Sequence, residues 1–529
     1  MPGAETGRMT TLEPLLEVTQ LAQLRVIPLL MLFAAVAAML VRSVRQAWFS
    51  AAGSALTGVA IAFGAAALSV ISAHAGSGSG DALGVTMSLL VAALGWVIVR
   101  YSRRYLEGEA GQRRYIVGLC LTLAGVHVVV LTDHLGVLVL AWSFTSFALH
   151  ALLTFYRDRP AAVLAAHKKF LASRLAEICL VLALLVVYRE SGTLSINEIA
   201  TMVATMPILP PGLHAAMVLI ALATILKSAQ LPVQGWLVQV MEAPTPVSAL
   251  LHAGVVNLGG FVLLRLAPLL SAAPFAQTLL VVIGSLTSVL AGLVMMTRVS
   301  IKVRLAWSTC AQMGFMLVEC GLGLYDLALI HLVAHSLYKA HAFLGAGETV
   351  SETRRRMLGD ALVAAPSAAW RLALRLLAAP AAIMMVALSA LSWKAAIPTL
   401  EISAVALIVV GLGLAPLLAT ESRRPLATLA RGTVQALLLT QLYILWHLVF
   451  VALLDAPATA PTQALAVWAA AIFSVLYFLQ TWLTVFPQGH LSRLLYPWAY
   501  AGFFLDERFT RLTFRLWPLP GAQASSFRQ

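Results

Sequence analysis

Ionisable side chains lie inside or beside apolar segments of this 529-residue sequence, and their chemistry is that of proton transfer. Lys227 ends an apolar run, Glu242 lies between helix-breaking prolines, and His252 lies in the next apolar run. Charged groups at membrane depth cost free energy and usually have a function. Broken helices place charges and backbone dipoles at transport sites. The stretch Ile225–Ala253 therefore predicts an ion-conducting site.

A second polar cluster is expected on a single helix. His331, His335 and Lys339 are spaced i, i+4 and i+8, so they share one helical face. An i, i+4 histidine pair could instead bind zinc. The sequence has no glutamate between the two histidines and no evident third ligand, so a hydrated proton path is the favoured interpretation.

The first of these residues also have purely structural explanations. Lys227 could extend its ammonium group to the lipid headgroups. Glu242 could stabilise the positive N-terminal end of the helix that follows it. His252 could be a core histidine, although a histidine's ordinary pKa suits proton transfer near neutral pH.

Three further candidates are more ambiguous. Glu177 follows Arg174 by one turn, so a local ion pair explains both residues. His150 lies in the fifth predicted helix, two turns after Ser143. Lys394 lies at a predicted helix end, where extension to the headgroups and a function are equally compatible with the sequence.

The composition excludes a soluble protein. The chain is 60% hydrophobic and 11% charged, with a mean hydropathy of +0.90, which is typical of repeated membrane spans. Its formal net charge of +13 is explained by Lys and Arg in cytoplasmic loops and does not indicate nucleic acid. The four cysteines lie in apolar runs without zinc spacing, so we expect free thiols.

Apolar length predicts an all-α, polytopic membrane protein with about 15 transmembrane helices. The expected helices are 26–42, 53–73, 83–100, 115–132, 134–155, 173–188, 213–228, 246–268, 276–296, 302–322, 326–346, 372–392, 397–419, 432–454 and 462–485.

Positive charges alternate between the connections, which predicts an odd number of spans with the N-terminus outside and the C-terminus in the cytoplasm. Lys168 and Lys169 are counted here as loop charges. The N-terminus lacks the basic start and cleavage site of a signal peptide, so we expect the first helix to remain as an anchor. Residues 76–80 predict a flexible loop, Ser195–Pro211 a short interfacial helix, and Leu491–Trp517 amphipathic segments that lie at the membrane surface or bind a partner.

The motifs resemble the antiporter-like subunits of respiratory complex I and of Mrp cation/proton antiporters. The resemblance is carried by residues 227–232, 242–253, 301–302, 306–309, 312–314 and the 331–339 cluster. It implies inverted five-helix repeats with discontinuous helices and proton conduction along the middle of the membrane. It also implies that Lys227 is the core lysine, that His252 and Lys302 link the two repeats, and that the 331–339 cluster follows.

The resemblance implies four regions: N-terminal helices (1–110), a first repeat (111–270), a second repeat (271–420), and C-terminal helices with an amphipathic tail (421–529). One departure from the pattern is important. The proton-pumping relatives have a glutamate after the tryptophan of the fifth helix, and here Ser143 follows Trp142. We expect Glu177 to replace that glutamate as the partner of Lys227, with His150 as a weaker candidate.

Residues 239–244 and 254–261 resemble a narrower branch, the DabB membrane subunits of DAB inorganic carbon transporters. This resemblance implies a soluble DabA-like zinc protein, bound on the cytoplasmic face of a bacterial inner membrane, that hydrates CO₂ to bicarbonate. It implies that this chain is a transporter subunit without a cofactor, that it conducts protons or another cation, and that it is not an enzyme.

Three alternative functions remain. The chain could be a subunit of a complex I-like, hydrogenase-linked or Mrp-type complex, but Ser143 and the expected lack of a long lateral helix disfavour this. It could be a membrane enzyme with a buried histidine, such as an acyltransferase. One reaction centre would need a compact cluster of residues, however, and the lysines are spread along the helix bundle. An inert anchor for a soluble partner is disfavoured by the many buried ionisable residues.

Overall fold

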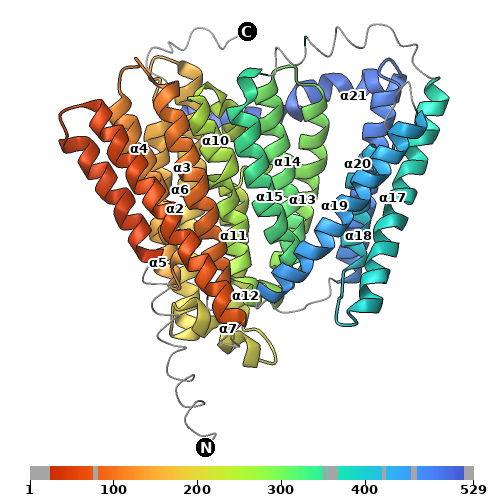
Figure 1. Cartoon of the computed structure of the whole chain (residues 1–529), viewed down its shortest axis with the longest axis horizontal. Helices are drawn as coiled ribbons and strands as arrows, with labels where there is room; N and C mark the ends of the chain where they lie inside the picture. Colours follow the sequence, from red (N-terminus) through yellow and green to blue (C-terminus); the bar gives the residue numbers. More distant parts are fainter. Residues whose placement is uncertain are drawn as a thin grey trace, which may run out of the picture. The chain divides into compact units, whose positions relative to one another are not determined.

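The computed structural model describes residues 24–74, 81–348, 354, 367–419, 425–453 and 462–517. Every named element in these ranges is a helix, and extended pairing is limited there to one isolated bridge between His134 and Ser195. The predicted all-α fold is therefore confirmed (Figure 1). The expected loop at 76–80 and the tail at 518–529 lie outside the described residues.

The helices follow one another along the chain with short connections. They are Leu24–Leu40, α2 (Val44–His74), α3 (Ala82–Tyr105), α4 (Gln112–Leu131), α5 (Leu135–Leu153), α6 (Pro160–Ser191), α7 (Ile196–Thr205), α8 (Pro211–Lys227), α9 (Gly235–Gln239), η1 (Val240–Glu242), α10 (Thr245–Ala253), η2 (Val255–Asn257), α11 (Leu258–Arg265), α12 (Ala267–Ser271), α13 (Pro274–Met296), α14 (Ile301–Gly321), α15 (Tyr325–Leu344), η3 (Ala346–Glu348), α17 (Ala368–Ala396), α18 (Ala404–Leu418), α19 (Pro425–Leu453), α20 (Gln463–Val485), α21 (His490–Tyr500), η4 (Gly502–Phe504) and α22 (Leu505–Leu516).

Eleven helices in the described residues are long and apolar enough to cross a membrane, and three shorter helices are also apolar. These helices define a multi-pass membrane protein. The predicted number of about 15 spans is not confirmed by this count.

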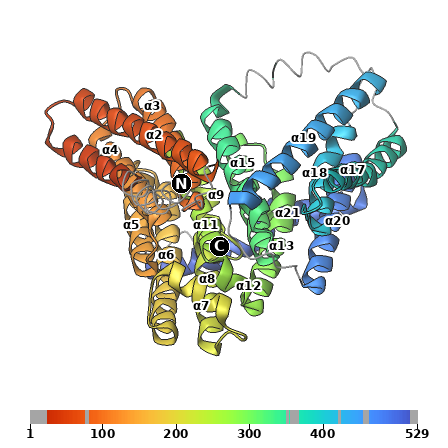
Figure 2. The same ribbon diagram turned by 60° about the horizontal axis from the view of Figure 1, so that its bottom comes forward.

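The chain forms two compact units. The first contains residues 1–273, 333–344 and 507–529, and the second contains residues 274–332 and 345–506. In the first unit, α2 packs against α3, α4 against α5, and α6 against both α5 and α8. In the second unit, α13 packs against α14, and α17 against α18 and α20, and Figure 2 shows the same groupings from another side.

The predicted break in the helix after Lys227 is confirmed. α8 ends there, and the short helices α9 and η1 precede α10. The single helix expected over 246–268 is wrong in one respect, because it is interrupted after Ala253. The side-chain amide of Asn257 donates to the carbonyl of Ala253 at 3.1 Å and to the hydroxyl of Ser336 at 2.7 Å. The first of these bonds satisfies the Ala253 carbonyl that the interruption frees, as a broken helix in a membrane requires, and the second links the Asn257 side chain to α15.

The sixth predicted helix is wrong at its start, since α6 begins at Pro160 and not at residue 173. Proline suits the first helical position, and the alanines after it favour a helix. Apolar length alone missed these turns because Lys168 and Lys169 interrupt the hydrophobic run. Both lysines are buried within α6, so their assignment to a loop is also wrong.

Two connecting segments agree with the sequence analysis. The short helix predicted within Ser195–Pro211 is present as α7. The carboxylate of Asp133 accepts hydrogen bonds from the Ser195 hydroxyl at 2.7 Å and from the Asn197 amide at 3.1 Å, which fixes the start of α7. One or two amphipathic segments are predicted within Leu491–Trp517, and the structure has two helices there, α21 and α22.

α13 and α14 approach each other closely at two glycines. A Cβ atom on Gly314 would lie 2.5 Å from the carbonyl oxygen of Gly284, and a Cβ on Gly284 would lie equally close to the carbonyl of Gly314. Small residues at such positions let helices pack closely where there is no hydrophobic drive between them. The glycine pair therefore determines the spacing of this helix pair.

We expect Gly314→Ala to destabilise the second unit by about 2 kcal/mol, because the added methyl group must push apart two backbones. Thermal unfolding of the detergent-solubilised protein measures this loss. Gly413→Ala in α18 is the matched control, since no atom lies within 4 Å of its Cβ position. It should leave stability unchanged or raise it by up to about 1 kcal/mol. Equal effects of the two substitutions would contradict the assigned role of the glycine pair.

Candidate functional site

Lys227 is the last residue of α8, where the negative end of the helix dipole favours a cation. Its ammonium nitrogen Nζ lies 3.6 Å from Glu177 Oε1 and 3.4 Å from Ser146 Oγ. The same nitrogen lies 4.6 Å from the ring centroid of Trp142, a cation–π contact. The side chain of Lys227 is only 4% exposed, so these groups replace water around its charge.

Glu177 is the carboxylate that the sequence analysis expected beside Lys227, and this pairing is confirmed. It also forms the expected local pair with Arg174, at 2.7 Å. The missing glutamate of α5 is therefore replaced by a carboxylate from α6. Trp142 still faces the lysine, and Ser146, one turn after Ser143, supplies a hydroxyl.

Lys169 belongs to the same cluster, although the sequence analysis did not select it. Its Nζ donates to the carbonyl oxygen of Ser146 at 2.8 Å, and its side chain is buried. It interacts electrostatically with Lys227, Arg174 and Glu177. A signal was present, because Lys169 and Glu177 are eight residues apart and so share one face of a helix. The wrong start of the sixth helix concealed it.

The cluster thus combines three basic side chains with one carboxylate. Arg174 stays protonated under all ordinary conditions. Burial and like charge together disfavour a second and a third positive charge beside it. The two lysines therefore compete for Glu177, and the arrangement can hold a proton on one lysine and pass it to the other.

His150 contacts a different set of residues from the one predicted. Its ring lies 5.5 Å from that of Phe170 and 6.4 Å from that of Trp517, by ring centroids. Trp517 also stacks on His167 at 3.8 Å. The chain segment after α22 therefore covers an aromatic and histidine cluster next to the start of α6. His150 interacts electrostatically with Lys169.

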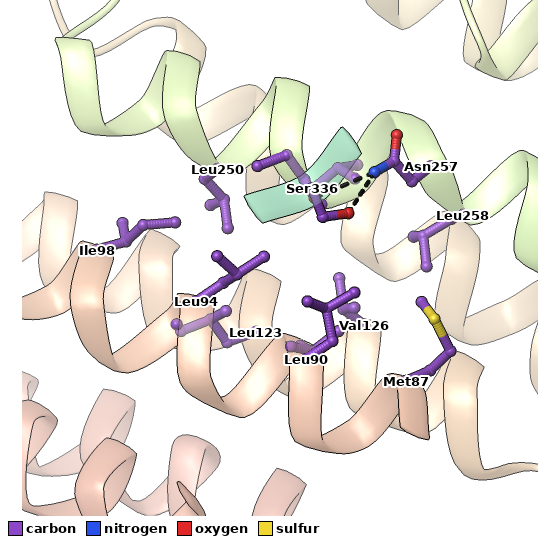
Figure 3. Close-up of a pocket in the computed structure, with 15 residues that line it drawn as sticks. Met87, Leu90, Leu94, Ile98, Leu123, Val126, Leu250, Asn257, Leu258 and Ser336 are labelled. Carbon is purple, nitrogen blue, oxygen red and sulfur yellow. Dashed lines mark hydrogen bonds between the residues drawn. The ribbon is translucent and has the colours of Figure 1, made fainter. Parts of the chain in front are cut away.

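His252 is fully buried in α10 and stacks on Phe343 of α15, with ring centroids 4.5 Å apart. Lys339 lies within electrostatic range of His252. The same part of α10 borders a cavity of about 20 Å³ (Figure 3). This volume has room for about one water molecule. The lining is mostly apolar, and Asn257 and Ser336 are its polar residues.

The histidine and lysine stripe predicted from spacing lies on α15. His331 is in the part of α15 that belongs to the second unit, where its Nδ1 lies 2.7 Å from Glu319 Oε2 of α14. His335 and Lys339 are buried and belong to the first unit. Glu319 was not among the predicted residues, although a carboxylate inside the predicted apolar helix 302–322 indicates a functional group. Among the described residues, no three His, Cys, Asp or Glu side chains form a group that could hold a metal ion.

Three predicted residues lie closer to the protein surface. Glu242 is 47% exposed and pairs with Arg159 at 3.6 Å. Lys302 is partly exposed in the first turn of α14, and Lys394 is exposed in the last turn of α17. The functional roles assigned to these residues stay predictions.

Comparison with known families agrees with this geometry. The family described as "NADH:quinone oxidoreductase/Mrp antiporter, TM" matches residues 132–395. The description "NADH-Ubiquinone oxidoreductase (complex I), chain 5 N-terminus" matches residues 78–116. The broken helices, the buried lysine and carboxylate, and the stripe on α15 all lie within the first match. The protein therefore has the fold of the antiporter-like class of membrane subunits.

Individual relatives narrow the assignment. A protein of Hydrogenovibrio crunogenus named "Probable inorganic carbon transporter subunit DabB" is 51% identical over 55% of this chain and 58% of its own length. A protein of Halothiobacillus neapolitanus named "Probable inorganic carbon transporter subunit DabB2" is 38% identical over 83% of this chain and 80% of its own length. The chain belongs to the DabB family.

A solved structure supports the class as well. A chain in the Mrp complex from Dietzia sp. matches with a TM-score of 0.51 and 26% identity, over 95% of this chain and 52% of that chain. The match to the first DabB relative likewise spans little more than half of that protein.

The buried and exposed ion pairs allow a matched stability test, because both have a nitrogen–oxygen separation of 3.6 Å. We expect Glu177→Gln to cost about 3 kcal/mol, since it leaves buried cations without a carboxylate. Glu242→Gln should cost about 0.5 kcal/mol, because water screens the exposed pair. Thermal unfolding in detergent measures both losses.

The double variant Glu177→Gln with Lys227→Met should recover part of the loss, because one of the uncompensated charges is then gone. A loss that is unchanged by removing the lysine would contradict the pairing.

Proposed function

We propose that this chain is the proton-conducting membrane subunit of an energy-coupled inorganic carbon pump. The observation that carries the proposal is the cluster of two buried lysines, Lys227 and Lys169, with the partly exposed Arg174 and Glu177, in which basic side chains outnumber carboxylates. A cluster of this kind costs free energy at membrane depth and is usually retained for function. The names of the two DabB relatives supply the carbon substrate.

The cluster works as a switch because Arg174 and Lys227 compete for one carboxylate. When Glu177 faces Lys227, the protonated lysine is stabilised. When Glu177 turns towards Arg174, the charge on Lys227 loses its partner, and the proton leaves for the next base. Trp142 and Ser146 keep the lysine in place during both states.

The remaining predicted residues extend the path. His252, within electrostatic range of Lys339, continues it towards His335 and His331 on α15. Lys302 links the two repeats. Glu242, His150 and Lys394 lie towards the ends of the path, where protons exchange with water.

The partner in this proposal is a DabA-like soluble zinc protein that hydrates CO₂ to bicarbonate. Zinc in that partner would lower the pKa of its bound water and so generate the nucleophile. This chain would act as a non-enzymatic subunit without a cofactor of its own. In this proposal the chain lies in a bacterial inner membrane. The alternation of positive charge supports an orientation with the N-terminus outside and with the C-terminus and the partner on the cytoplasmic side.

A second candidate is a proton-translocating subunit of a complex I-like, hydrogenase-linked or Mrp-type complex. The likeness to a chain of an Mrp complex favours it. The neighbouring reading frames separate the two proposals. A DabA-like zinc protein beside this gene supports the carbon pump, whereas a row of respiratory or Mrp subunits would rule it out.

Co-expression with a DabA-like partner should let a carbonic-anhydrase-deficient bacterium grow in air. An uncoupler should abolish uptake of labelled inorganic carbon, because uptake depends on the ion gradient. The partner alone and this chain alone are the controls. Uptake that persists after the gradient collapses would contradict coupling.

Lys227→Ala should abolish uptake while leaving membrane insertion intact. Lys169→Met should lower uptake by about 10²-fold, because removing a positioned proton-transfer group typically costs 10²–10⁴ in rate. Arg189→Met, an exposed residue of the same helix α6, is the matched control and should retain full uptake. If Lys169→Met behaved like Arg189→Met, Lys169 would have no part in the path.

A further inference from the structure

We propose that Glu319, Asp326, His331 and His447 form a second proton-binding site, through which protons enter the chain. The inference rests on the proposed function and extends it from His331 to Glu319, Asp326 and His447 of the second unit, which no motif assigned. All four residues belong to that unit. They come from three helices, α14, α15 and α19.

Two carboxylate–imidazole pairs build the site. Glu319 Oε2 lies 2.7 Å from His331 Nδ1, and Asp326 Oδ2 is hydrogen-bonded to His447 Nδ1. Glu319 is two residues before the end of α14, and Asp326 is in the first turn of α15. The two carboxylates therefore flank the same tight turn, at one end of the α14–α15 hairpin.

The two carboxylates differ in burial. The side chain of Asp326 is 20% exposed, whereas that of Glu319 is 2% exposed. The two histidines are buried to a similar degree, with His447 7% and His331 11% exposed. In the proposal, Asp326 is therefore the group that water reaches first. Each pair can hold a proton on either partner, because imidazole and carboxylate both bind protons within a few pH units of neutrality. A proton that binds at Asp326 and His447 can move inward to Glu319 and His331.

Tyr443 of α19 connects the two pairs. Its hydroxyl group interacts electrostatically with both Asp326 and Glu319. Within the described part of the chain, neither that hydroxyl nor Glu319 Oε1 has a hydrogen-bond partner, and both atoms are buried. Buried polar atoms are normally paired, and those that are not often belong to functional sites. In the proposal, the Tyr443 hydroxyl and Glu319 Oε1 are the polar atoms through which a proton passes from one pair to the other.

A purely structural role explains these features less well. Buried charged pairs contribute little net stability compared with apolar residues of the same volume. The position of His331 also favours a transport role, because it begins the stripe that continues at His335 and Lys339 on α15.

The predicted topology gives the direction of flow. Lys302 and Arg304 lie at the start of α14, and positive residues mark the cytoplasmic side. The opposite end of α14, with Glu319 and the turn before Asp326, then lies on the outside. Protons driven inward by the membrane potential would therefore bind first at Asp326 and His447.

The test uses the complete complex with its soluble partner, reconstituted into liposomes that contain a pH-sensitive dye. A potassium diffusion potential, negative inside, drives proton uptake. We expect His447→Ala to lower the uptake rate by about 10²-fold, the usual contribution of a positioned acid–base group. Imidazole added to the outer solution should restore much of the rate, because it can replace the missing side chain. It should not restore Lys227→Ala.

Asp326→Asn should lower the rate similarly, because asparagine keeps the shape of the side chain but has no carboxylate to bind a proton. Glu401→Gln, an exposed carboxylate of the same unit, is its matched control and should be unaffected. A wild-type rate in His447→Ala, or a loss that imidazole leaves unchanged, would overturn the entry site while the proposed function stands. A wild-type complex without any proton uptake would instead refute the proposed function, and the entry site with it.

Discussion

The competition of several cations for one buried carboxylate is the constraint on which the first unit depends. Lys227, Lys169 and Arg174 all act on Glu177, and the low polarity of their surroundings makes each added charge expensive. Three helices must therefore hold their positions closely. α8 ends at Lys227, α6 carries the other charged groups, and α5 supplies Trp142 and Ser146. A small movement of any one helix would change the distances between Glu177 and the three cations.

The broken helices leave free polar backbone groups next to such a cluster. An uninterrupted helix satisfies its own backbone and leaves no free polar group, whereas the interruption after Ala253 directs Asn257 towards Ser336 on α15. The side-chain amide of Asn257 thus donates both to the freed carbonyl of Ala253 in α10 and to Ser336 on α15, the helix that carries His335 and Lys339. Non-helical backbone of this kind, which a soluble protein would place in a surface loop, is here enclosed among helices.

Much of the fold followed from apolar length, and the break after Lys227 followed from its prolines. The partner of Lys227 was also predictable, because Glu177 was the carboxylate available in the next predicted helix. The sequence could not reveal the true start of α6, because that start was judged from the boundary of a hydrophobic run. A lysine pair lowers the local hydropathy in the same way whether it lies in a loop or inside a helix, so Lys169 was assigned to solvent.

Glu319 and the pair of Asp326 and His447 were missed for another reason. Their partners lie 12 and 121 residues away along the chain, and only tertiary packing brings them together. The interruption at Gly254 was also hidden, because the apolar run through 246–268 continues across it.

The relocation of the carboxylate from α5 to α6 has a consequence for comparing such proteins. Position 143 holds serine, so a column-by-column alignment with proton-pumping relatives would report the charge as lost. In this chain a carboxylate of the neighbouring helix α6 nevertheless pairs with Lys227. The partner of such a lysine is therefore identified from the side chains that surround it in space and not from one sequence position.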